Sequence, residues 1–277
     1  MQVLRTVSDL RRARSSMVGS VGFVPTMGYL HQGHLTLVRR ARQENQRVVV
    51  SIFVNPMQFG PQEDLLHYPR DEERDRGLLE GEAVDVLFIP SVAEMYPAGY
   101  STFVEVEEVT RRLEGASRPG HFRGVATVVA KLFNIVMPTR AYLGEKDAQQ
   151  LLVVRRMVQD LNMDMAIVAV PTVREPDGLA MSSRNVYLSP EERRAATILW
   201  RALQLAQGLY SKGEKRGRSI RDQMVHLINS EPSAKVDYVN VADAETLEDL
   251  EEVKAPALAS LAVWIGKTRL IDNIMLK

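Results

Sequence analysis

The first two thirds of the chain alternate short β-branched apolar runs with helical patterns, and this alternation constrains the fold more than any other feature. Residues 47–54, RVVVSIFV, form a nearly continuous apolar run, which is typical of a strand covered on both faces. Residues 34–44 place apolar side chains on one side and arginines on the other, as an amphipathic helix does. Strands and helices in this order predict an α/β domain with a doubly wound parallel sheet. The other strands predicted for this sheet are residues 21–25, 85–90, 140–144 and 165–173.

The pattern changes after about residue 172, where we place a domain boundary. A serine–proline pair, a strong signal for a helix start, opens residues 189–211, which continue as one long amphipathic helix. Residues 235–243 alternate in the manner of a strand, and residues 257–274 are expected to form two closing strands. We therefore expect two domains, a larger one at residues 1–172 and a smaller α+β domain at residues 173–277.

The composition excludes several classes of protein. The 277 residues include no cysteine, which rules out disulfides, thiolate nucleophiles, iron–sulfur clusters and cysteine-ligated zinc, and fits a reducing compartment. Lysine and arginine together number 35, as do aspartate and glutamate, whereas a dedicated nucleic-acid binder usually carries a basic excess. The sequence has no run of about 20 apolar residues and no apolar segment of a secretory signal. We expect a cytoplasmic protein with no membrane or nucleic-acid partner.

The segment PTMGYLHQGH, residues 25–34, lies between a predicted buried strand and the amphipathic helix after it. Open α/β sheets bind ligands at the carboxyl ends of their strands, and a helix N-terminus offers unpaired N–H groups to a phosphate. His31 and His34 are three residues apart and would project to the same side of the first helical turn. Gly28 and Gly33 would let the backbone approach a ligand closely. The segment therefore predicts a phosphate site, and the alternative is a loop whose histidines only cap the helix.

Other phosphate and metal motifs are absent from the sequence. The GKT at residues 266–268 is not a P-loop, because Leu261 occupies the position where the motif needs its first glycine. No G-x-G-x-x-G follows the first predicted buried strand, and no H-E-x-x-H occurs. The histidine pair in residues 25–34 has no nearby third ligand, which disfavours zinc.

Two further segments offer polar side chains near predicted strand or helix ends. Asn55 and Gln58 follow the second predicted buried strand, where they would orient a small polar substrate. The charged loop at residues 60–76 is a candidate flap, and a plain surface loop is the alternative. His121 and Arg123, in the segment GHFRGV, are compatible equally with a role in the site and with packing.

Two later segments carry cations and hydroxyl groups. Lys146 and Asp147 stand at a predicted helix start, with Gln150 one turn further on the same face. A lysine beside a helix N-terminus is electrostatically unfavourable unless an anion also binds there, so a phosphate ligand is indicated. Residues 182–184, Ser-Ser-Arg, offer hydroxyl and guanidinium donors that suit a polyphosphate. The alternative for this segment is a turn before the next helix.

With these segments in this order, the chain closely resembles the pantothenate synthetase (pantoate–β-alanine ligase) family. The resemblance runs essentially from end to end, through PTMGYLHQGH, FVNPMQF, EDLLHYPR, HFRGV, GEKDAQQ, VPTVRE, MSSRN and the terminal TRLIDN. It implies an N-terminal Rossmann-like domain, a smaller C-terminal domain that closes over the site as a lid, and a homodimer. It also implies the ATP-dependent condensation of (R)-pantoate with β-alanine through a pantoyl adenylate, with release of AMP and diphosphate.

The resemblance also assigns roles to individual residues. The residues that would bind ATP are Met27, Gly28, Tyr29, Leu30, His31, Gln32, Gly33, His34, Gly144, Glu145, Lys146, Asp147, Val173, Met181, Ser182, Ser183 and Arg184. Gln58 and Gln150 would hold pantoate, with Gln58 also near β-alanine, and His34 corresponds to the family's proton donor. Attack on a phosphate needs cations and donors where charge develops. The residues expected to supply them are His31, His34, Lys146 and Arg184.

One departure from the family's pattern concerns the metal. Family members often carry adjacent acidic residues after the YPR segment, whereas here Arg74 interrupts the stretch and Asp75 follows it. A protein ligand for Mg²⁺ therefore stays unassigned, with Asp75 only a weak candidate, and the metal is expected to arrive with ATP.

Two other functions stay open. A nucleotidylyltransferase shares the HxGH start but leaves the nucleotide on its product, and the pair Gln58 and Gln150 favours the ligase over it. The long VPTVRE–MSSRN block favours the ligase as well. A catalytically silent, RNA-binding relative of the aminoacyl-tRNA synthetases is disfavoured by the zero net charge and by the lack of a basic appended domain.

Overall fold

The computed structural model describes residues 1–61 and 63–276, which divide into two compact units. The first unit consists of Met1–Thr110, Arg118–Glu145 and Gln149–Pro171. The second consists of Arg111–Ser117, Lys146–Ala148 and the described residues from Thr172 onward. Two short segments from the middle of the chain thus belong to the same compact unit as its C-terminal third.

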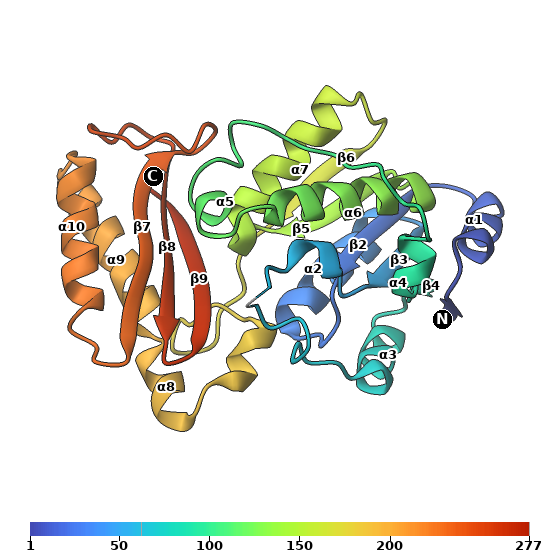
Figure 1. The fold of residues 1–277 in the computed structure, drawn as a ribbon, viewed down its shortest axis with the longest axis horizontal. Coiled ribbons are helices and arrows are strands. Elements are labelled where there is room, and N and C mark those ends of the chain that lie inside the picture. Colours follow the sequence, from blue (N-terminus) through green and yellow to red (C-terminus); the bar gives the residue numbers. More distant parts are fainter. Residues whose placement is uncertain (62, 277) are drawn as a thin grey trace. The chain divides into compact units, whose positions relative to one another are not determined.

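A six-stranded parallel sheet forms the centre of the first unit (Figure 1). Its strands are, in spatial order, β1 (Gln2–Leu4), β4 (Val86–Phe88), β3 (Arg47–Ile52), β2 (Val21–Thr26), β5 (Arg140–Gly144) and β6 (Ala166–Val170). From β2 the chain adds β3 and β4 on one side, and it then adds β5 and β6 on the other. The direction of winding therefore reverses between β2 and β5, and ligands bind at the carboxyl ends of strands at such a switch point.

Helices cover both faces of this sheet. The helices associated with it are α1 (Val7–Ser15), α2 (Gln32–Glu44), α3 (Glu72–Gly81), α4 (Val92–Met95), α6 (His121–Val136) and α7 (Ala148–Asp160). Val24 belongs to a buried cluster with Val38 of α2, whereas the Phe23 ring meets Phe133 of α6 edge to face at 6.2 Å. Neighbouring residues of a strand point to opposite faces of the sheet, so α2 and α6 lie on opposite faces. The predicted doubly wound α/β architecture is confirmed.

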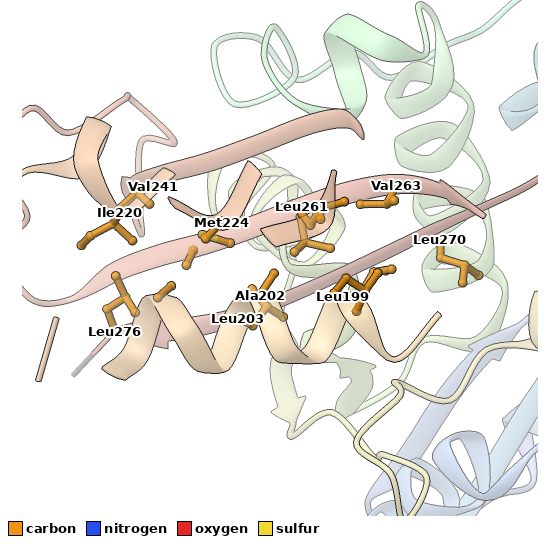
Figure 2. Packing of buried hydrophobic residues seen from close by; sticks show 14 of the residues in the cluster. Leu199, Ala202, Leu203, Ile220, Met224, Val241, Leu261, Val263, Leu270 and Leu276 are labelled. Atoms are coloured by element: carbon orange, nitrogen blue, oxygen red, sulfur yellow. The ribbon is translucent and has the colours of Figure 1, made fainter. Parts of the chain in front are cut away.

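A three-stranded antiparallel sheet forms the centre of the second unit. Its strands are β7 (Ala234–Asp243), β8 (Ala257–Ile265) and β9 (Thr268–Leu276), and its helices are α5 (Glu114–Ser117), α8 (Pro190–Ala195), α9 (Ile198–Ser211) and α10 (Gly217–Ile228). Figure 2 shows the apolar faces of α9, α10 and the three strands meeting in one buried cluster, which includes Leu199, Leu203, Ile220, Met224, Leu261 and Val263. The expected smaller α+β fold, with two closing strands, is confirmed.

The single helix expected at residues 189–211 is wrong, because the chain breaks between α8 and α9. The hydroxyl and the backbone N–H of Thr197 both donate to the carbonyl of Arg194, at 2.8 and 3.2 Å. In a continuous α-helix this N–H would bond four residues back, to residue 193. A threonine hydroxyl that competes for a nearby carbonyl disturbs the helical ladder, and here the ladder is interrupted.

Candidate active site

The loop between β2 and α2 turns through two successive residues in the left-handed region. Gly28 has a φ of 83° and Tyr29 a φ of 50°. A Cβ at Gly28 would lie 2.8 Å from Ile52 Cγ2 of β3, so packing as well as backbone conformation requires glycine there. The structure thus gives Gly28 a close approach to the neighbouring strand. The loop leads to the N-terminus of α2, whose first amides and dipole favour an anion.

His31 and His34 cap the N-terminus of α2. His31 Nδ1 accepts a hydrogen bond from Gly33 N at 3.1 Å, and His34 Nδ1 accepts one from His31 N at 3.3 Å. The ring centroids are 4.0 Å apart and the ring planes are inclined by 35°. Because each Nδ1 accepts a backbone N–H, each neutral ring carries its proton on Nε2. Capping, the alternative raised from the sequence, is thus compatible with a site, since it orients two Nε2–H donors.

Asp75, in the first turn of α3, binds the same loop from the other side. Its Oδ2 accepts a hydrogen bond from Tyr29 N and its Oδ1 accepts one from Leu30 N, both at 2.7 Å. The side chain is 1% exposed, and burial raises the pKa of its carboxyl in spite of these two bonds. From the sequence, Asp75 is only a weak candidate for a metal ligand. No local pattern signals its contact with the loop, because the partners are 45 and 46 residues away.

Asn55 links Gln58, which is expected to bind the substrate, to α6 and to Tyr96. Asn55 is 1% exposed, and its Nδ2 donates to Gln58 Oε1 and to Gly124 O, both at 3.1 Å. Tyr96 donates from its hydroxyl to Asn55 Oδ1 at 2.8 Å. Gln58 Nε2 donates to Met27 Sδ at 3.3 Å. The structure therefore brings together two expected site residues, Gln58 and Met27, which come from the loops after β3 and β2.

His121 and Arg118 hold the backbone of Gln58. His121 Nδ1 lies 2.8 Å from Gln58 O, and its Nε2 lies 3.1 Å from Arg118 Nη1. A carbonyl only accepts and a guanidinium only donates, so the ring carries its proton on Nδ1 and accepts at Nε2. Arg118 also donates to both carboxylate oxygens of Glu63, at 2.6 and 2.7 Å. Burial opposes the ionisation of Glu63, but Arg118 outweighs it and lowers the pKa of that carboxyl.

The segment GHFRGV contains residues with different roles. His121 supports Gln58, as described above, whereas the exposed Arg123 stacks on the Phe103 ring at 3.9 Å from its centroid. Gly124 allows α6 to approach the loop after β3, because a Cβ there would lie 2.2 Å from Met57 O. In the structure, His121 thus contacts the backbone of Gln58, whereas Arg123 packs on an aromatic ring.

Lys146 lies in a 3₁₀ turn, Glu145–Asp147, between β5 and α7, where the sequence predicted a helix start. Asn273 of β9 donates from Nδ2 to Lys146 O at 2.8 Å. Lys146 Nζ lies 3.8 Å from Asp147 Oδ1, and its side chain is 18% exposed. An ammonium group has three donors, so the contact with Asp147 at this distance leaves it able to bind an anion. Gln150 follows in α7 and is half-buried.

Asp272, the neighbour of Asn273 in β9, forms a buried ion pair with Arg174. Arg174 donates to Asp272 Oδ2 and Oδ1 at 2.5 and 3.0 Å, and burial raises the pKa of the Asp272 carboxyl despite this pair. Nearby, Met181 N donates to Val173 O at 3.0 Å, which places two expected ATP-binding residues side by side. In the sequence, the segment TRLIDN supports only the family resemblance. In the structure it belongs to β9, and the register of this strand places Asp272 beside Arg174 and Asn273 beside Lys146 O.

Ser182, Ser183 and Arg184 lie at the start of one 3₁₀ turn, Ser183–Tyr187, just before α8. Ser182 Oγ accepts a hydrogen bond from Arg184 N at 3.3 Å and so caps this turn. Ser183 is buried. A turn before the helix, the alternative raised from the sequence, describes the backbone here.

Within residues 1–61 and 63–276, no three histidine, aspartate or glutamate side chains are grouped as a metal site would require. The same part of the chain contains no helix with the length and apolar character needed to cross a membrane.

Comparison with known proteins gives matches over the whole length. The family model described as pantoate-beta-alanine ligase matches residues 2–275. The pantothenate synthetase of Roseiflexus castenholzii is 62% identical over 277 residues, with 100% of both chains covered. The crystal structure of pantothenate synthetase from Thermus thermophilus has a TM-score of 0.96 and 53% identity, covering 100% of this chain and 99% of that one. Pantoate-beta-alanine ligase from Francisella tularensis, complexed with beta-gamma ATP and beta-alanine, has a TM-score of 0.83 and 35% identity, covering 99% and 97%.

Proposed function

The chain belongs to the pantoate–β-alanine ligase family and is an enzyme of that class, and we propose that it works through a pantoyl adenylate. In the first step, the carboxylate of (R)-pantoate attacks the α-phosphorus of ATP and diphosphate leaves. In the second, the amine of β-alanine attacks the acyl carbon, AMP leaves and the amine loses a proton. The product is pantothenate, a precursor of coenzyme A.

The observation that carries this proposal is the double capping of α2 by His31 and His34 at the switch point of the sheet. Negative charge develops on the phosphates during the attack, and donors already oriented toward that charge stabilise it without reorganising. Two Nε2–H groups beside a helix N-terminus suit this need. Gln58, held beside Met27, supplies an uncharged amide for pantoate. The Francisella tularensis relative, named with ATP and β-alanine, supports the same choice of substrates.

The capping geometry supports hydrogen-bond donation by His34 more than proton transfer. Proton transfer would require an imidazolium ring, whose extra proton on Nδ1 would displace the N–H of His31. Diphosphate leaves readily as an anion, so a neutral donor and cations are sufficient. From the family resemblance we assign Lys146 and Arg184 as those cations, and Gln150 as a second amide for pantoate.

Mg²⁺ would arrive with ATP and neutralise part of the phosphate charge. No protein ligand is assigned to it, because both carboxylate oxygens of Asp75 accept backbone N–H groups. The remaining expected ATP-binding residues belong to the same four segments as these groups, at residues 27–34, 144–147, 173 and 181–184.

We also propose a cytoplasmic homodimer, which the family resemblance and the lack of cysteine support. The charged segment expected as a flap, residues 60–76, includes the start of α3 from Glu72 onward, so the proposed flap is confined to residues 60–71, of which Gln62 lies outside the described residues. It would protect the adenylate from water. Light scattering measures the molecular mass in solution, and the mass of a single chain of 31.1 kDa would exclude the dimer.

A product assay with ATP, Mg²⁺, (R)-pantoate and β-alanine tests the function. We expect AMP and pantothenate to form only when all three substrates are present. Omission of β-alanine should leave a single turnover of diphosphate release, because the adenylate stays bound. Continuous diphosphate release with neither AMP nor pantothenate would show that the nucleotide remains on an acceptor, as in a nucleotidylyltransferase, and would refute the ligase.

A further inference from the structure

We propose that Asp75 is a positioning residue for this reaction, which from α3 holds the loop between β2 and α2 in the conformation that orients His31. The inference rests on the proposed function, because His31 is one of the donors assigned above. Asp75 itself is placed under the loop, where its two carboxylate oxygens face the backbone N–H groups of Tyr29 and Leu30.

The loop is held on both sides of His31. Asp75 binds the N–H groups of the two residues before it, and His31 itself binds the N–H of Gly33 after it. Leu30, between the two contacts, is fully buried. A shift of the backbone at Tyr29 or Leu30 would therefore be transmitted directly to the His31 ring.

The conformation of the loop needs such a partner. Tyr29 has a positive φ, which is unfavourable for a residue with a Cβ and persists only when its surroundings enforce it. The N–H groups of Tyr29 and Leu30 both donate to a side chain that is 1% exposed. Without Asp75, the buried N–H of Leu30 would lose this acceptor.

A negative charge beneath a phosphate-binding loop also requires an explanation. A carboxylate there repels ATP, so a side chain that only filled space would be better uncharged. The charge is useful if its two oxygens are both needed as acceptors, because charge-assisted hydrogen bonds are stronger than neutral ones. A contact of 3.5 Å between Arg74 Nη1 and Asp75 Oδ1 compensates part of the charge.

This geometry argues against a role of Asp75 as a metal ligand. Each oxygen accepts a short hydrogen bond from the backbone, and the side chain is almost completely removed from solvent. A Mg²⁺ ion keeps several of its waters and binds carboxylates that it can reach. The two roles therefore predict different responses to the concentration of Mg²⁺.

The test uses the full-length variants Asp75→Asn and Asp75→Glu, with Glu80→Gln as the matched control. Glu80 is an exposed carboxylate of the same helix, α3, and lies outside the segment proposed as a flap. In Asp75→Asn an amide NH₂ faces one of the loop N–H groups, so we expect kcat to fall by about 10²-fold, the effect of misplacing a donor. We expect a smaller loss in Asp75→Glu, which keeps both oxygens, and wild-type kcat in the control.

Two further readouts distinguish positioning from other roles. The Mg²⁺ concentration for half-maximal rate should be unchanged in Asp75→Asn. Long-range ¹H–¹⁵N correlation spectra report the protonation of each ring nitrogen, and with five histidines in the chain the His31 signals can be assigned by substitution. We expect the Nε2–H form of His31 in the wild type and a changed pattern in Asp75→Asn, with the exposed His226 unaffected.

Several results would overturn the proposal. These are wild-type kcat in a folded Asp75→Asn variant, a loss of rate that excess Mg²⁺ restores, and His31 signals that do not change. If Asp75→Asn does not fold, wild-type kcat in Asp75→Glu has the same meaning, and failure of both variants to fold would assign Asp75 to the fold alone. If the wild type forms no pantothenate, the proposed function fails, whereas the His31 spectra still decide whether Asp75 orients that ring.

Discussion

In His31 and His34, one ring nitrogen caps the helix, and the proposed function uses the other as a hydrogen-bond donor. Each Nδ1 accepts a backbone N–H at the start of α2. Loss of a helix cap costs about 1 kcal/mol of stability, whereas loss of an oriented donor to a phosphate lowers the rate by about 10²–10³-fold. The stability and the rate of one variant therefore separate the two contributions.

Replacement of His34 or Lys146 by alanine is expected to lower the rate of adenylate formation by about 10²–10³-fold, because each removes one donor to the developing charge. Release of diphosphate in a single turnover measures this step. His226→Ala, at an exposed position of α10, is the control and should release diphosphate at the wild-type rate. Near-normal release by either of the first two variants would contradict the role assigned to that residue.

The ion pair of Glu63 and Arg118 predicts that the free energy of unfolding decreases at low pH. Although burial opposes ionisation, Arg118 lowers the pKa of Glu63 below the ordinary value of 4.5. A carboxyl whose pKa is lowered by folding stabilises the fold above the unfolded pKa, and this contribution disappears as the pH falls through the folded pKa. Between about pH 5.5 and pH 3, the wild type should lose about 1 kcal/mol more than Glu63→Gln. Urea denaturation at each pH measures the difference, and equal losses would show that the pair does not stabilise the fold.

Among the elements of the first unit, the contact of α6 with the loop after β3 determines where Gln58 lies. Gly124 has no room for a Cβ, since Met57 O would be 2.2 Å away, and Asn55 binds its carbonyl. His121, one turn earlier in α6, holds Gln58 O. A single helix therefore positions Gln58 both by the small size of a glycine and by two hydrogen bonds.

The variant Gly124→Ala should push α6 away from the loop after β3. We expect a destabilisation of about 1–3 kcal/mol from overpacking, with a raised KM for pantoate because Gln58 moves with its backbone. Denaturant unfolding and steady-state kinetics measure the two effects. Gly208→Ala in α9 is the matched control: no atom lies within 4 Å of the new Cβ, so this variant should be as stable as the wild type or more so, by up to about 1 kcal/mol. Similar behaviour of the two variants would contradict the packing argument.

Some elements could be predicted from the sequence because their signal is local. The buried runs that became β2, β3 and β5 are short, β-branched and bounded by loops. The strand β1 has only three residues and no apolar run, so nothing in the sequence distinguishes it until β4 pairs with it. At the break between α8 and α9, the hydroxyl and the N–H of Thr197 share one carbonyl, and amphipathic spacing does not report such a local change.

For the molecule as a whole, nucleotide binding should appear as increased stability. A ligand that binds only the folded chain adds about 2.7 kcal/mol to the free energy of unfolding at 100 times its Kd. We expect ATP with Mg²⁺ to shift the denaturation midpoint accordingly, because the expected contacts with the phosphates exist only when the chain is folded. Mg²⁺ alone is the control and should shift it little. An unchanged midpoint at saturating ATP would contradict nucleotide binding.

The local patterns of the chain were sufficient for the fold class, the strand–loop–helix setting of the histidine pair and the family resemblance. These features depend on neighbours in the sequence, through side-chain periodicity and the exposed amides of a helix start. The order of the strands, the partner of the loop before α2 and the support of Gln58 were decided by tertiary structure. Asp75 meets Leu30 across 45 residues and His121 meets Gln58 across 63. Such contacts exist only after separate elements pack and bury polar groups that must find partners, and no single segment encodes which partner that will be.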